Sequence, residues 1–114
     1  MKTNADTASW ERQYRQLVAS LARTGYISQG SVLDRSTLQP ARSGYQWTRK
    51  VAHKTVTVAL SAEQYSALGQ AVSNRRRLQQ TIKQMESLSR KILFRSLPDT
   101  RRRKRLGKKV LGVI

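Results

Sequence analysis

The longest hydrophobic pattern in the chain covers residues 61–95. Apolar side chains recur there three, four or six to seven positions apart, which is the spacing of one helical face: Tyr65, Leu68, Val72, Leu78, Ile82, Met85, Leu88 and Ile92. At the start, Ser61 and Gln64 have the spacing of a capping box, in which each side chain bonds the backbone N–H of the other residue. The next proline is Pro98. The pattern therefore predicts one long helix.

The apolar face of this helix is interrupted near position 75. Three cations stand there, which we name the collar: Arg75, Arg76 and Arg77. Beyond the collar, four apolar residues form a stripe that we name the distal stripe: Ile82, Met85, Leu88 and Ile92. A seven-residue ladder from position 71 to 92 suits pairing with another helix. We expect the distal stripe to bind a second copy or a helix of another protein, with packing on the chain's own domain as the alternative.

A second helical pattern lies near the N-terminus. Its apolar face has positions i, i+4, i+7, i+8 and i+11: Trp10, Tyr14, Leu17, Val18 and Leu21. Asp6 or Thr7 can cap this helix, and Gly25 follows its expected end at about Thr24. The pattern predicts a helix with Trp10 and Tyr14 in the core.

Between the two helices the pattern changes to alternation with turn residues. Residues 30–35 fit a short strand, and residues 36–44 fit a loop that contains Pro40. Residues 45–51 and 55–60 are rich in β-branched and aromatic side chains and fit a β-hairpin joined through residues 52–54. The core face of the hairpin is expected to carry Val56, Val58 and Leu60. Alternation leaves open which face of the first arm lies beside them, and so whether Trp47 packs in the core or stacks on a base.

Together these elements predict an α+β fold with an N-terminal helix, a small antiparallel hairpin or three-stranded sheet, a long C-terminal helix and a basic tail. We expect a flexible leader over residues 1–6, a single domain over residues 7–95 and the tail over residues 96–114. The first helix, the hairpin and the start of the long helix would form one small core. The distal stripe would then lie beyond it.

Charge points to the partner. The chain has 23 Lys and Arg against six Asp and Glu, a net charge of +17, and residues 75–109 alone have a net charge of +12. Such an excess favours binding to a polyanion, because each neutralised phosphate releases condensed counterions. The residues expected to contact nucleic acid lie in the hairpin, the collar and the tail: Arg49, Lys50, His53, Lys54, Arg75, Arg76, Arg77, Arg101, Arg102, Arg103, Lys104, Arg105, Lys108 and Lys109.

Residues for catalysis are sparse in this sequence. There is no cysteine, only one histidine, and the six acids are widely spread. No pair of acids has a local spacing for acid–base or two-metal chemistry, and no glycine-rich phosphate loop precedes a helix. We expect no enzymatic activity, no metal, no cofactor and no small-molecule substrate. No segment resembles a signal peptide or a membrane span, so a cytoplasmic location without membrane binding is expected.

An ordered series of short segments resembles a family of small basic bacterial proteins of unassigned function that are often carried on transposons, plasmids or phages. The segments begin at Gly30, Gly44, Lys54 and Leu60, and a helix containing Asn74, Arg75 and Arg76 follows, so the resemblance covers about residues 25–93. Members of that family usually have a cysteine-rich loop where this chain has residues 36–43, without cysteine. The resemblance implies a mobile-element context, but no metal or redox role.

The expected function is a non-catalytic nucleic-acid-binding protein, an accessory subunit of a DNA- or RNA-processing machine of a mobile element. A ribosomal-type RNA scaffold protein fits the same features. The alternative is a protein-directed inhibitor or regulator of a nucleic-acid enzyme, in which the basic surface occupies an acidic cleft. The sequence does not distinguish DNA from RNA, or a specific site from general binding.

Overall fold

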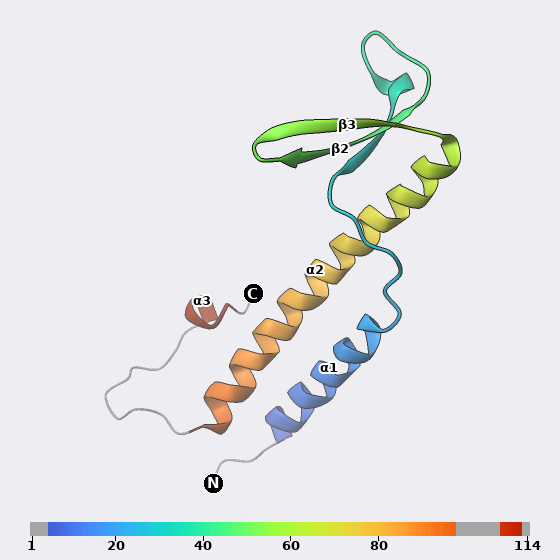
Figure 1. Cartoon of the computed structure of the whole chain (residues 1–114). Coiled ribbons are helices and arrows are strands. Elements are labelled where there is room, and N and C mark those ends of the chain that lie inside the picture. Colours follow the sequence, from blue (N-terminus) through green and yellow to red (C-terminus); the bar gives the residue numbers. More distant parts are fainter. Residues whose placement is uncertain (1–4, 98–107, 113–114) are drawn as a thin grey trace. The chain divides into compact units, whose positions relative to one another are not determined.

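The computed structural model describes residues 5–97 and 108–112 (Figure 1). The elements along the chain are helix α1 (Ala5–Leu21), strand β1 (Ser31–Asp34), the short 3-10 helix η1 (Arg35–Thr37), strands β2 (Tyr45–Val51) and β3 (Lys54–Leu60), and helices α2 (Ala62–Ser96) and α3 (Lys108–Leu111). The three strands form one antiparallel sheet in the order β1-β2-β3. The predicted α+β fold is confirmed.

The chain forms two compact units. Thr24–Leu78 contains the sheet and the first half of α2, and we name it the sheet unit. Met1–Arg23 and Gln79–Ile114 form the other, named the helical unit, in which α1 packs with the second half of α2. The single domain over residues 7–95 stays a prediction from the sequence. Within the helical unit, α1 packs with the distal stripe, because an apolar helical stripe must be covered but does not specify its partner.

The start of α2 follows directly from its sequence. Ser61 donates its backbone N–H to Gln64 Oε1 at 2.9 Å, and Gln64 donates its own N–H to Ser61 Oγ at 3.1 Å. The predicted capping box is therefore confirmed, and two backbone donors that a helix start leaves without partners are satisfied. α1 begins at Ala5, so Asp6 lies in its first turn, and its end at Leu21 comes three residues before the expected Thr24.

The sheet is attached to α2 by one face. In the register, Tyr45 is opposite Leu60 and Trp47 is opposite both Val32 and Val58, so these side chains share a face. The Tyr45 ring stacks on Tyr65 of α2 with centroids 4.3 Å apart. The structure therefore answers the question that alternation left open: the face with Tyr45 and Trp47 lies toward α2.

The cover on this face is incomplete. Val56 and Val58 lie on it as expected, yet both are exposed, whereas Leu60 at the corner before α2 is half-buried. The strands run away from that corner toward the hairpin turn (Figure 1). The expectation that Val56 and Val58 are core residues is therefore wrong: β3 is an edge strand, and of its residues only Leu60, next to the start of α2, is half-buried.

The segment between β1 and β2 is held by a carboxylate cap. Asp34 Oδ1 accepts the backbone N–H of Ser36 at 3.0 Å and so caps η1. This bond, with a second from the Ser36 hydroxyl, lowers the pKa of the Asp34 carboxyl below its usual value of 3.8. Arg35 donates its backbone N–H to Gly44 O at 2.9 Å, which brings the two ends of the loop together.

Candidate nucleic-acid interface

The tip of the hairpin is a two-residue turn that displays cations. Ala52 and His53 both have positive φ, 50° and 69°. Positive φ at both central residues is typical of a type I′ turn, whose twist matches that of the two flanking strands. Val51 pairs with Lys54 across the turn. The four predicted hairpin contacts are all exposed: Arg49, Lys50, His53 and Lys54. The structure thus gathers these four residues at one end of the sheet.

The cations of the tip divide between the two faces of the hairpin. Arg49 and Lys54 lie on the face of Trp47, and Lys50 lies on the opposite face. The Arg49 guanidinium lies over the Trp47 ring, 5.7 Å from its centroid. The indole N–H donates to Gln29 O at 2.9 Å. Because Trp47 is half-buried and bonded within the chain, the structure favours packing over base stacking for this side chain.

The collar occupies the middle of α2. Arg75 is half-buried, whereas Arg76 and Arg77 are exposed. Arg75 lies one turn after the buried Ala71, so it stands where the apolar face would otherwise continue. Arg77 donates a guanidinium hydrogen bond to Asn74 Oδ1. The collar and the hairpin tip both belong to the sheet unit.

The carboxylates pair elsewhere. The three ion pairs among described residues join Glu11 to Arg15, Glu86 to Arg90 and Asp6 to Arg95, all within the helical unit. Within residues 5–97 and 108–112, no carboxylate forms an ion pair with the following cations of the sheet unit: Arg49, Lys50, Lys54, Arg75 and Arg76. These charges are therefore available to an external anion.

The tail residues predicted to contact nucleic acid fall mostly outside the part of the chain that the structure describes. The predicted contacts Arg101, Arg102, Arg103, Lys104 and Arg105 lie outside the described residues. Lys108 and Lys109 begin α3, and Lys109 is exposed. Their role in binding nucleic acid stays a prediction.

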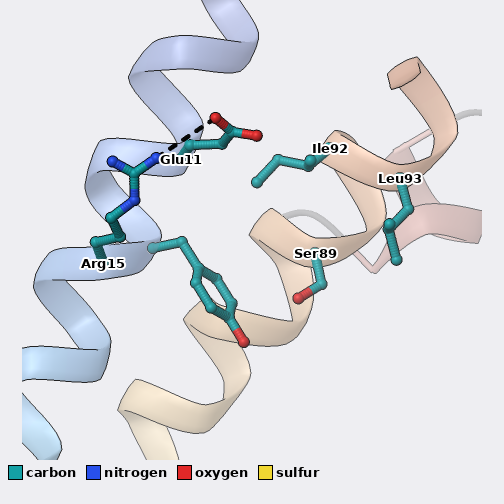
Figure 2. Close-up of a pocket in the computed structure, with 6 residues that line it drawn as sticks. Glu11, Arg15, Ser89, Ile92 and Leu93 are labelled. Atoms are coloured by element: carbon teal, nitrogen blue, oxygen red, sulfur yellow. Dashed lines mark ion pairs between the residues drawn. The ribbon is translucent and has the colours of Figure 1, made fainter. Parts of the chain in front are cut away.

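The distal stripe, predicted to bind a partner, packs with α1. Leu88 is buried, Met85 and Ile92 are half-buried, and Ile82 is 43% exposed. Tyr14 of α1 lines a shallow groove of about 300 Å³ with Ser89, Ile92 and Leu93, and Figure 2 shows the Glu11–Arg15 ion pair beside it. A second groove of about 320 Å³ lies between Tyr14 and the side chains of Ile82 and Met85. Much of the cover that the stripe needs is thus supplied by α1, and binding of a partner there stays a prediction.

A polar cluster around the buried Asn74 was not predicted from the sequence. Asn74 is only 8% exposed and donates through Nδ2 to Tyr26 O at 2.9 Å. Its Oδ1 accepts from Gln70 Nε2 at 3.0 Å and from Arg77. One asparagine on a polar helix has no periodic signal. The nearest hint is Gly25, where a Cβ would lie 3.0 Å from Asn74 Nδ2.

The described part of the chain has no group of three or more His, Cys, Asp or Glu side chains placed to hold a metal ion. None of the helices described is long and apolar enough to cross a membrane.

Comparison of the chain with models of known protein families, with curated proteins and with solved structures gave no match. The resemblance to small basic proteins of mobile elements is therefore still a prediction from the sequence.

Proposed function

We propose that the chain is a non-catalytic nucleic-acid-binding protein whose sheet unit contacts phosphates. One observation carries the proposal: the cations of the hairpin tip, with Arg75 and Arg76 of the collar, form no carboxylate ion pair in the described chain, whereas acids of the helical unit pair with arginines. The sheet unit has eight Lys and Arg and two acids, a net charge of +6. One of those acids, Asp34, caps η1, and the other, Glu63, lies in the first turn of α2.

The geometry of these cations suits contacts with the phosphate backbone of a nucleic acid better than buried ion pairs. The hairpin cations are exposed and stand on both faces of the tip, so they can follow an extended anion without losing much hydration. Phosphate contacts of this kind position a protein but carry no sequence information. We therefore expect charge to dominate the binding of nucleic acid, with contributions from the hairpin tip and the collar.

The test is a salt titration of full-length protein against labelled oligonucleotides, single-stranded and duplex, of DNA and of RNA. Each phosphate contact contributes about 0.7 to the slope of log K against log salt on single strands and about 0.9 on duplex DNA. Replacing Arg49, Lys50 and Lys54 by Gln should flatten the slope by about 2 to 3. Fluorescence anisotropy between about 50 and 200 mM salt would measure this change.

A matched control removes the same charge from the helical unit. Arg12, Arg23 and Lys83 are exposed there, so their replacement by Gln lowers the net charge equally. The proposal expects a much smaller change in slope from this control. Equal slopes for the two triple variants would contradict a site on the hairpin. Absence of salt-dependent binding by the unmodified protein would contradict the function itself and favour a protein-directed regulator.

A further inference from the structure

The side chain of Tyr26 is almost fully exposed to solvent. It is 93% exposed, although burial of a tyrosine ring is ordinarily favourable. The other three aromatic side chains of the sheet unit have partners. Tyr45 and Tyr65 stack on each other, and Trp47 bonds Gln29 O and lies under Arg49. Tyr26 is thus the aromatic ring of this unit that is available to a ligand.

This exposure comes from a fixed backbone and not from a loose segment. Asn74 Nδ2 donates to Tyr26 O at 2.9 Å, and the backbone N–H of Ser28 donates to Ala71 O at 3.2 Å. Both acceptor and donor on α2 belong to buried residues. At Gly25 the approach to Asn74 is so close that a Cβ would lie at 3.0 Å. The main chain on both sides of the ring is therefore held against α2.

The guanidinium of Arg77 is linked to the main chain that carries the ring. The amide of Asn74 that bonds the Tyr26 carbonyl also accepts a hydrogen bond from Arg77, so a single side-chain amide joins the guanidinium to the Tyr26 backbone. Arg76 is the exposed neighbour of Arg77. An exposed aromatic side chain whose backbone is linked to a guanidinium group through one amide matches a ligand that combines a flat ring with negative charge. An unpaired nucleotide has both, whereas a base inside a duplex has its faces covered by its neighbours.

We propose that Tyr26 stacks on an unpaired base of single-stranded nucleic acid while Arg76 and Arg77 contact the adjoining phosphates. The inference rests on the proposed function and adds a ligand class, because the hairpin contacts alone do not distinguish single strands from duplexes. DNA and RNA share the chemistry of base and phosphate, so separate DNA and RNA arms of the experiment identify the strand.

The experiment compares Tyr26→Ala and Tyr26→Phe in the full-length protein. Oligonucleotides of one sequence are presented as single strands and as duplexes, at two salt concentrations. Tyr26→Ala should weaken single-strand binding by about 5- to 150-fold, the range for loss of one stacked base, with an unchanged salt slope. Duplex binding should not change. Tyr26→Phe should bind like the unmodified protein, since the ring is retained.

The controls separate stacking from folding. Ile27→Ala removes a neighbouring exposed side chain and should leave both affinities unchanged. Because the Tyr26 ring is exposed, thermal melts of Tyr26→Ala should match those of the unmodified protein. A single strand containing 5-bromouracil, irradiated in the complex, should crosslink to Tyr26, as mapped by mass spectrometry of the digested complex.

Several results would overturn the inference. Equal single-strand affinities of Tyr26→Ala and the unmodified protein would do so, as would equal losses on single strands and duplexes. A loss in Tyr26→Phe as large as in Tyr26→Ala would assign the contact to the hydroxyl and not to the ring. If the hairpin triple variant weakens binding but Tyr26→Ala does not, only this inference fails. If the unmodified protein binds no nucleic acid, the proposed function fails together with it.

Discussion

The two halves of α2 form cores of different kinds. In the sheet unit the buried residues are Ala71, Val72 and Asn74, two small apolar side chains and an amide. In the helical unit it presents large apolar side chains, of which Leu88 is buried while Met85 lies half-buried. One helix thus supports a closely fitted unit with an amide in its core and a loosely fitted unit with a large apolar core residue.

The difference lies in how closely the backbones approach. In the sheet unit, a Cβ at Gly69 would lie 3.4 Å from Val32 Cγ2, and Ser28 bonds directly to the carbonyl of Ala71. In the helical unit, long side chains leave two shallow grooves of about 300 and 320 Å³ beside Tyr14. Substitutions that add atoms should therefore lower the stability of the sheet unit most, and substitutions that remove atoms should lower the stability of the helical unit most.

The largest effect is expected from Gly30→Ala. Gly30 has φ +101°, and a Cβ there would lie 2.3 Å from Thr48 O and 2.6 Å from Trp47 Nε1. The positive φ alone costs about 1–3 kcal/mol. Loss of the Trp47–Gln29 bond would add about 1 kcal/mol. We expect the sheet unit to lose about 3 kcal/mol or more of its free energy of unfolding, measured by hydrogen exchange of β2 and β3 amides.

Gly44→Ala is the matched control for this steric effect. Gly44 has a similar φ, +94°, but a Cβ there would meet only the Arg35 side chain at an ordinary 3.6 Å. Its cost should therefore be the backbone strain of about 1–3 kcal/mol and no more. Equal destabilisation by the two substitutions would show that the close approach at Gly30 is not what holds the unit together.

Leu88→Ala tests the other side of the comparison. Leu88 is 7% exposed, so truncation removes buried apolar surface and leaves a cavity. We expect a loss of about 2–3 kcal/mol in the helical unit, toward the lower end of such substitutions because the neighbouring grooves let α1 relax. Exchange of α1 amides would measure it. Leu93→Ala, at a residue 53% exposed, should change stability by less than about 0.5 kcal/mol. A comparable loss at both positions would mean that the distal stripe is not a core.

Sequence periodicity predicted the elements well because their signals are local. β2 has the predicted bounds, β3 begins one residue earlier than expected, and both bonds of the capping box are present. The partner of α1 was not predictable, because an apolar stripe specifies that it must be covered but not by what. The exposed cations of the hairpin follow from alternation and turn position.

Asn74 and Tyr26 could not be found in this way. Their relation depends on a hydrogen bond between positions 48 residues apart, and neither residue belongs to an apolar period. The close approach that makes the bond possible depends on Gly25, which in the sequence indicates only a helix end. Long-range polar contacts of this kind leave no local pattern, so the candidate stacking site became visible only in the structure.

The smallest effect is expected from pH and Asp34. The Ser36 backbone N–H, and then its hydroxyl, lower the pKa of the folded-state carboxyl below 3.8, so ionised Asp34 stabilises the sheet unit. That contribution is fully present above the unfolded-state pKa and is lost as pH falls through the lower folded-state value. Asp34→Asn keeps an oxygen acceptor for the Ser36 N–H but removes the charge. Its free energy of unfolding should fall slightly below that of the unmodified protein at neutral pH, and the difference should vanish in strong acid. Urea unfolding at a series of pH values would measure this difference, with hydrogen exchange of the β1 and β2 amides as the readout for the sheet unit. A difference that stays constant as the pH falls would show that the cap acts by hydrogen-bond geometry alone.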